Sequence, residues 1–199
     1  MVEKGNSITL GLEYEKQNLN NEKIIGFNIG NVIKDKKNKN LPVKTKLDQT
    51  RSDIVGNLFY KFDDKIEFNY NFSYDRDLDY SNYDSIKIKL GLNKFMTSFD
   101  YIIENNDFGN SEIITNDTLY QFSKEHTIKF NSTKDLKDDF TQFYKFSYEY
   151  QTDCLLASFE YQKNFFRDGS LVPDDSLVFL IKFIPFAEIR GAANTVFEK

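Results

Sequence analysis

The sequence has few of the residues that cross-link a small domain or interrupt its secondary structure. Its 199 residues include one cysteine, one histidine, three prolines, nine glycines and no tryptophan. One cysteine excludes an internal disulfide, and the lack of a cysteine–histidine cluster excludes a zinc site. No run of about 18 apolar residues is present, which excludes a transmembrane helix. The opening residues also lack the regions of a signal peptide, so the protein is cytoplasmic or Met1 is not its biological start.

The charge balance and the aromatic content narrow the class of protein. A net charge of −5 argues against nucleic acid as a partner, because nucleic-acid-binding domains are usually basic. The chain carries 20 phenylalanines and 12 tyrosines, yet 29% of its residues are charged. This mixture fits long strands that have one aromatic, apolar face and one hydrated face.

Apolar residues recur at every second position over most of the chain. In KIEFNYNFSYD, residues 65–75, alternate positions from Ile66 to Tyr74 are apolar and the intervening ones are polar. Side chains alternate across a strand, so this period predicts strands rather than helices. We predict about eleven antiparallel strands, at residues 6–15, 22–33, 52–62, 65–75, 82–92, 94–105, 112–123, 126–133, 139–150, 154–165 and 175–188.

The lengths of the strands and of their connections favour a transmembrane β-barrel. Membrane-spanning strands need about 9–11 residues. Short connections alternate with longer ones, as in outer-membrane barrels, where short turns and long loops lie at opposite ends. A soluble β-sandwich used as a binding module is the alternative, although sandwich strands are usually shorter and share one apolar core.

The C-terminal third resembles a known family. The resemblance is carried by YEYQTDC (148–154), SFEYQKN (158–164) and SLVFLIKFIPFAEIRG (176–191), and more loosely by LPVKTKLDQTRSDIVGNLFY and QFSKEHTIKFN. These stretches resemble the C-terminal end of the LPS-assembly outer-membrane proteins of the LptD family. The resemblance implies that residues 1–191 are the C-terminal portion of a larger outer-membrane barrel and that 192–199 form a tail.

The family's function gives the expected activity and partners. The resemblance implies transport of lipopolysaccharide (LPS) from a periplasmic bridge protein into the outer leaflet of the outer membrane. It implies a barrel whose lumen holds a plug lipoprotein, a preceding periplasmic domain, and a lateral seam between the first and last strands. No enzymatic activity and no cofactor are expected. A self-contained small outer-membrane barrel, porin-like or structural, is the main alternative.

Two C-terminal features acquire roles through this resemblance. The family carries cysteines at the turn before its penultimate strand, which implies that Cys154 forms a disulfide with a partner outside this chain; a lone thiol without a role is the alternative. The resemblance also makes the last strand one lip of the seam, whereas a plain buried strand or a barrel-insertion signal is the blander interpretation. The seam residues are Leu177, Phe179, Ile181, Phe183 and Pro185.

Charged residues suggest further contacts. Within the basic segment 34–46, we consider Lys36, Lys37 and Lys39 as ligands for LPS phosphates, because ammonium groups pair with phosphate; a solvated loop is the simpler interpretation. The polar face of the strands would line the lumen, as in any wide barrel. The predicted lumenal residues are Glu67, Lys87, Lys89, Lys145, Glu149, Glu160 and Lys182.

His126 is the sole candidate for acid–base catalysis. It opens a predicted strand, and no serine or acid stands at a telling spacing from it. A hydrolase would need a base held near a nucleophile and an orienting group. A membrane-embedded hydrolase therefore remains only a minor alternative, in which replacing His126 would abolish activity.

Overall fold

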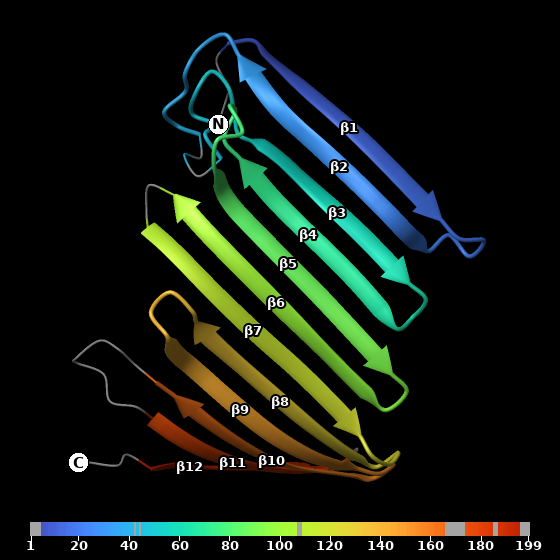
Figure 1. The fold of residues 1–199 in the computed structure, drawn as a ribbon. Helices are drawn as coiled ribbons and strands as arrows, with labels where there is room; N and C mark the ends of the chain where they lie inside the picture. Colours follow the sequence, from blue (N-terminus) through green and yellow to red (C-terminus); the bar gives the residue numbers. More distant parts are fainter. Residues whose placement is uncertain are drawn as a thin grey trace. The chain divides into compact units, whose positions relative to one another are not determined.

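The computed structural model describes residues 5–41, 43, 45–106, 109–165, 174–184 and 187–195. The protein is all-β, and each strand pairs with its neighbours in chain order, from β1 to β12 (Figure 1). Among the described residues, no helix has the length and apolar character needed to cross a membrane. The strands are β1 (Ser7–Gln17), β2 (Lys23–Lys34), β3 (Ile54–Phe62), β4 (Ile66–Tyr74), β5 (Ser81–Leu92), β6 (Phe95–Asn106), β7 (Gly109–Gln121), β8 (His126–Asp135), β9 (Phe140–Gln151), β10 (Leu155–Asn164), β11 (Asp174–Phe183) and β12 (Ala187–Thr195).

The predicted all-β, antiparallel class is confirmed, but the number of strands is twelve. The predicted last strand, 175–188, is divided into β11 and β12. The apolar run that continues past Phe183 gave no sign of a turn except Pro185, which lies outside the described residues. The predicted boundary between barrel and tail, at residues 191 and 192, falls inside β12. In this strand order β1 and β12 each have one paired neighbour, so the described sheet is not closed; membership of a larger barrel stays a prediction.

The strands belong to two compact units. Unit 1 comprises residues 1–89 and 100–112, and unit 2 comprises residues 90–99 and 113–199. Strands β1 to β4 lie wholly in unit 1 and β8 to β12 wholly in unit 2. Strands β5, β6 and β7 contribute to both.

In unit 1 the pairing register sorts side chains into an apolar and a polar face. Phe27, Leu58 and Tyr70 are cross-strand partners on one face. On the other face, Asn57 donates from Nδ2 to the Oδ1 atoms of Asn69 and Asn71, both at 2.8 Å. Directly opposite residues share a face, so the alternation seen along one strand extends across the neighbouring strands.

Unit 2 shows the same division. Phe130 pairs with Phe146, and the rings of Phe159 and Phe179 meet at 5.2 Å, edge to face. Residues of the opposite face, such as Glu149 and Ser158, pair with each other across β9 and β10. We call the two surfaces the apolar face and the polar face.

The usual distribution of burial is inverted. Among the described residues, no hydrophobic side chain is buried, whereas many large apolar side chains are exposed, including Ile8, Phe62 and Phe179. A soluble sheet normally buries its apolar face against another layer. The buried side chains are polar: Ser52, Asp53, Ser73, Asp75, Asn82, Ser85, Thr97, Thr133, Ser147 and Asp175.

Connections of two lengths alternate along the chain. Residues 18–22, 63–65, 93–94, 122–125 and 152–154 form short turns at one end of the strands, here called the short-turn end. The opposite, long-loop end carries the connections after β2 and β4, which are residues 35–53, of which 42 and 44 are not described, and residues 75–80. Asp63 and Asn93 enter their turns with φ of 55° and 47°, a left-handed conformation that Asp and Asn tolerate. The predicted long loop between β6 and β7 is a two-residue connection, because both strands extend further than their apolar pattern.

Candidate functional site

Cross-strand ion pairs cover the polar face. Lys89 lies 2.8 Å from Glu67, Lys145 3.2 Å from Glu160, and Lys87 3.5 Å from Asp100. Lys129, which the sequence did not single out, pairs with Glu149 at 3.3 Å. Lys182 is on the same face by register, opposite Leu156. Exposed pairs of this kind contribute only about 0–1 kcal/mol, so their main effect is a hydrated surface of mixed charge.

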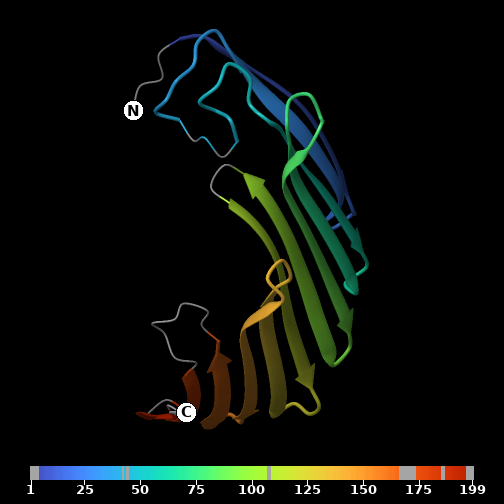
Figure 2. The same ribbon diagram turned by 60° about the vertical axis from the view of Figure 1, so that its left-hand side comes forward.

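The most enclosed side chain of the described residues is Asp53, which is 0% exposed. It lies at the end of the loop 35–53, which turns back toward one side of the strands of unit 1 (Figure 2). Asp53 Oδ2 accepts hydrogen bonds from Asn82 Nδ2 at 2.7 Å and Ser73 Oγ at 3.2 Å. The loop is anchored to β2 as well, because Ser52 donates its amide to the Val32 carbonyl at 2.9 Å and its Oγ accepts the Val32 amide at 2.8 Å.

Lys46 connects this loop to the end of β4. Its Nζ donates to Tyr80 Oη at 2.7 Å and to Asp75 Oδ1 at 3.0 Å, and lies 4.0 Å from Asp53 Oδ1. Burial alone would lower the pKa of Lys46, but the bonds to Tyr80 and Asp75 and the two carboxylate charges outweigh it and raise the pKa. We call Lys46, Asp53, Asp75 and Tyr80 the Lys46 latch.

The two carboxyl groups of the latch have opposite pKa shifts. Burial raises the pKa of Asp53, against the smaller effects of Asn82, Lys46 and Ser73. The hydrogen bond from Lys46 lowers the pKa of Asp75. Lys46 therefore forms its stronger pair with Asp75, while Asp53 is held mainly by neutral donors.

A cleft of about 540 Å³ adjoins the latch at the long-loop end. Its cationic lining residues are Lys37, Lys46, Arg51 and Arg76, and its acidic ones are Asp48, Asp75 and Asp77. Lys36, Lys37 and Lys39 are all exposed, but of these three only Lys37 lines the cleft. The sequence gave no sign of Arg51, Arg76 or Asp53, because their neighbours come from separate loops and strands rather than from one periodic segment.

The predicted seam strand, β11, lies between two paired strands. Leu177, Phe179, Ile181 and Phe183 lie on the apolar face by register, and Phe179 is 50% exposed. On the other face Val178 and Leu180 pair with Glu160 and Ser158. The prediction that this is the last strand was wrong, since β12 pairs along its full length. Pro185 lies outside the described residues.

Cys154 lies at the short-turn end in the turn that joins β9 to β10. The thiol is exposed and free, and its sulfur is 3.9 Å from Thr152 Oγ1. The carbonyl of Cys154 accepts the amide of Ile184 at 2.9 Å, which ties this turn to the end of β11. An exposed thiol is accessible to an external partner, and that pairing stays a prediction.

His126 is part of an aromatic cluster rather than a triad. Its Nδ1 lies 2.6 Å from Tyr148 Oη, and its ring centroid is 4.8 Å from that of Tyr150 and 5.2 Å from that of Phe122. A hydrogen bond to a phenol and stacked rings do not activate a nucleophile, which a hydrolase requires. Among the described residues, no group of three or more His, Cys, Asp or Glu side chains could hold a metal ion.

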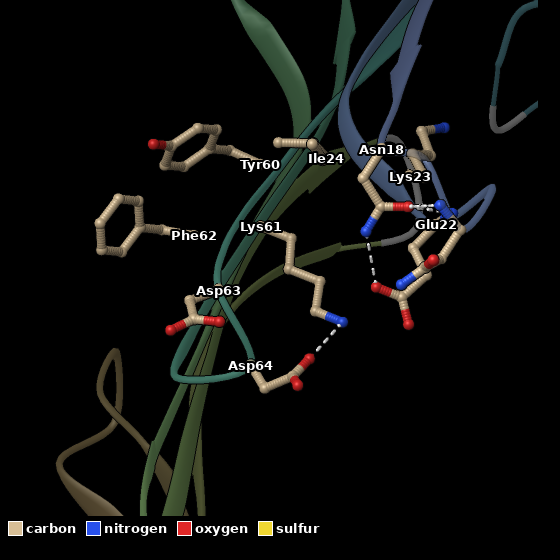
Figure 3. A pocket seen from close by; sticks show the side chains of 10 residues that line it. Asn18, Glu22, Lys23, Ile24, Tyr60, Lys61, Phe62, Asp63 and Asp64 are labelled. Atoms are coloured by element: carbon tan, nitrogen blue, oxygen red, sulfur yellow. Dashed lines mark hydrogen bonds and ion pairs between the residues drawn. The ribbon is translucent and has the colours of Figure 1, made fainter.

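A polar cleft of about 470 Å³ lies at the short-turn end of unit 1 (Figure 3). Lys61 pairs with Asp64 at 2.8 Å, and Asn18 Nδ2 donates to Glu22 Oε2 at 2.9 Å. Tyr60 and Phe62 project to the opposite side of the strand, away from these groups. The cleft is thus a gap between two hydrated turns, and it brings no nucleophile and base together.

Comparisons with known proteins add no family to this geometry. No protein-family model matches the chain, and no curated protein matches it. The resemblance of the C-terminal segments to the LptD family therefore enters only as a proposal.

Proposed function

We propose that this chain is a membrane-inserted part of an outer-membrane β-barrel that transports LPS to the outer leaflet without an enzymatic reaction. The observation that carries the proposal is the inverted burial: exposed apolar side chains over a sheet whose buried side chains are polar. An exposed apolar face is unfavourable in water, but in the hydrocarbon of a lipid bilayer its exposure costs no hydrophobic free energy. The strands, of nine to thirteen residues, have the length that a tilted span needs.

A soluble β-sandwich is less consistent with these features. Two packed sheets bury their facing apolar residues in a shared core. Here the large side chains of the apolar face stay open, as Phe130 and Phe146 do at 39% and 38% exposure. A face of this kind in water would be an aggregation hazard.

Three features support LPS as the substrate. The polar face, with ion pairs such as Lys145–Glu160 and Lys89–Glu67, would line a wet path for sugars and phosphates. β11 has apolar residues on both faces, which suits the passage of acyl chains near an edge. The exposed Lys36, Lys37 and Lys39 lie at the long-loop end, where headgroup phosphates would be met.

The proposed partners follow from the same resemblance. They are LPS, a plug lipoprotein in the lumen, a periplasmic bridge protein reached through a preceding domain, and the outer membrane itself. Cys154 would join the short-turn, periplasmic end to that domain through a disulfide, in a compartment oxidising enough to keep it.

A self-contained small barrel is the second candidate, and the strand number favours it. Bacterial single-chain barrels have an even number of strands, and this sheet has twelve. The two candidates differ in what passes the polar face. A porin-like barrel would carry small solutes and would show no selective contact with LPS.

Site-specific photo-crosslinking in outer membranes separates the two candidates. A benzophenone side chain is placed at Leu180, on the polar face of β11, and in a control at Asn131, on the polar face of β8. Transport near the β11–β12 edge predicts an LPS adduct at Leu180 that is much stronger than at Asn131. Equal or absent labelling in a chain that is inserted in the membrane would contradict LPS transport and support the small barrel.

A further inference from the structure

The apolar face of unit 2 consists of rows of side chains that run across the strands. The rows in the middle are apolar, and the rows toward each end of the strands contain polar or amphipathic side chains. Cross-strand partners lie side by side, so residues of the apolar face that pair with one another form a row across the strands. Successive rows are two residues apart along each strand, because alternate side chains point to opposite faces. One middle row contains Phe130, Phe146, Tyr161 and Leu177. The next contains Tyr120, Ile128, Tyr148, Phe159 and Phe179.

Toward the long-loop end the next row is polar in five strands, and in β7 the polar residues begin one row earlier, at Thr118 opposite Phe130. Lys163 Nζ lies 3.5 Å from Asp175 Oδ1 and 5.4 Å from the centroid of the Phe165 ring. The side chain of Lys163 is 30% exposed, and its ammonium group lies over the Phe165 ring. The row, in register order, is Asn116, Ser132, Tyr144, Lys163 and Asp175.

Toward the short-turn end the apolar rows finish in amphipathic rings. Phe122, His126 and Tyr150 form a stack, with Tyr148 hydrogen-bonded to the imidazole. The turn that follows is charged and self-bonded, with Ser123 Oγ donating to Glu125 Oε2 at 2.9 Å. Aromatic rings that carry a polar atom, placed next to a charged turn, are typical of a boundary between an apolar and a wet layer.

We infer that the Lys163 row and the His126 ring stack mark the two hydrocarbon boundaries of a lipid-contacting surface on unit 2. This inference rests on the proposed membrane insertion and adds the depth at which the sheet sits. The partner is a phospholipid bilayer: the ammonium of Lys163 lies at the phosphate level of one leaflet, and the ring stack lies at the interface of the other.

The spacing of the two boundaries fits a thin bilayer. Asp175 belongs to the polar row. The ring-stack level reaches β11 at Ile181, because Tyr150 pairs with Ala157 and Ala157 pairs with Ile181, six positions from Asp175. Six steps of about 3.4 Å span about 20 Å along the strand, or about 16 Å across a membrane at a tilt of about 40°. The apolar band of outer-membrane barrels is taller, about 25 Å, so the bilayer would thin locally beside unit 2 while the Lys163 ammonium extends outward.

The absence of tryptophan makes depth directly measurable. Single-tryptophan variants of the full chain, Tyr144→Trp, Phe130→Trp and Phe122→Trp, are inserted into phosphatidylcholine vesicles brominated at shallow or deep acyl positions. Tyr150→Trp repeats the ring-stack level if Phe122→Trp inserts poorly. Phe143→Trp is the matched control, because Phe143 adjoins Tyr144 but lies on the polar face, opposite Asn164.

The inference predicts at least a two-fold stronger quenching of Phe130→Trp by deep than by shallow bromines, and the reverse order for Tyr144→Trp and Phe122→Trp. Phe143→Trp should be quenched by aqueous acrylamide and not by bromolipid. If every apolar-face variant is quenched but without this order of depth, the boundaries are wrong and membrane insertion stands. If bromolipids quench none of the apolar-face variants, the lipid surface itself is refuted.

Discussion

At the residue scale, Asp53 shows how a loop can be held on a sheet whose described residues include no buried hydrophobic side chain. Its carboxyl group is enclosed by donors from β4 and β5, and Lys46 reaches the same place from the loop. Buried polar groups must be satisfied, so removing one member leaves the others at a free-energy cost. The latch therefore fixes residues 45–53 more firmly than their composition suggests.

Lys46→Ala should release this segment. The substitution leaves Asp75 and the buried Asp53 without their cation, and we expect the local opening free energy of the Ser52 and Asp53 amides to fall by about 1–3 kcal/mol. Hydrogen exchange of these two amides measures the effect. Lys39→Ala, at an exposed lysine of the same loop, is the control and should change neither amide.

The latch should also depend on pH. The pKa of Asp75 is lowered, so its contribution is present above the unfolded value of about 4 and is lost as the pH falls through the lower, folded value. The pKa of Lys46 is raised, so its contribution is present below about 10.4 and is lost only as the pH rises further. Burial raises the pKa of Asp53, which opposes the acid loss at Asp75 because protonated Asp53 is favoured in the fold.

Exchange protection of the loop should consequently fall below about pH 4 in the wild-type protein. In Asp75→Asn this acid-dependent loss should be absent, with lower protection already at pH 7. A loop that is equally protected at pH 3 and pH 7 in the wild-type chain would show that Asp75 does not hold it.

One glycine illustrates how closely neighbouring strands approach. A Cβ placed on Gly56 would lie 2.3 Å from Phe72 Cζ and 2.7 Å from the Asn28 carbonyl oxygen. Overpacking of this kind costs about 1–3 kcal/mol, which Gly56→Ala should show in urea unfolding of the detergent-folded protein. At Gly191 an added Cβ meets no described atom within 4 Å, so Gly191→Ala is the matched control and should be nearly neutral.

At the element scale, the alternation of side chains predicted where strands occur but not where they stop. The period-two pattern located β1 to β10 to within a few residues, because each has one apolar face. β8 continues through Lys134 and Asp135, which are polar, because their backbones still pair with Thr141 and Phe140 in β9. Backbone hydrogen bonds do not depend on side-chain polarity, so the alternation of polar and apolar residues cannot show where a strand of this kind ends.

The division between β11 and β12 was missed for a related reason. The stretch after Phe183 stays apolar on both sides of the turn, so no polar cluster marked it. The latch was missed as well, since its members come from two separate connections, 35–53 and 75–80, that only the fold brings together. What the sequence did show is which face of a strand is apolar, and the register confirms it along β4, although Val55 and Phe59 of β3 pair with Ser73 and Asn69 on the polar face.

The two faces of a strand should respond oppositely to an added charge. Phe146→Lys places an ammonium on the apolar face and should destabilise the lipid-inserted protein by about 2–4 kcal/mol if it lies near the bilayer midplane. Ser158→Lys places the same charge on the polar face, opposite Glu149, and should cost less than about 1 kcal/mol. Urea titrations in lipid vesicles compare the two, and equal costs would contradict the assignment of the faces.

At the scale of the whole molecule, the twelve strands pair only with their chain neighbours, and the described residues contain no hydrophobic core. A sheet of this kind gains stability from its surroundings or from further strands at the edges of β1 and β12. Membrane lipid would be the surroundings that stabilise the apolar face, and the remainder of a larger barrel would provide the further strands at the edges of β1 and β12. The even number of strands leaves closure of this chain by itself as the competing arrangement.

The size and redox state of the native polypeptide test this account most directly. An antibody raised against the strands β8 to β10 is used on outer membranes, separated in gels with and without reductant. We predict a band far above 23.4 kDa that changes mobility on reduction, because Cys154 would be joined to a domain outside this sequence. A band at 23.4 kDa that is indifferent to reductant would contradict the account and would establish a small, self-contained protein.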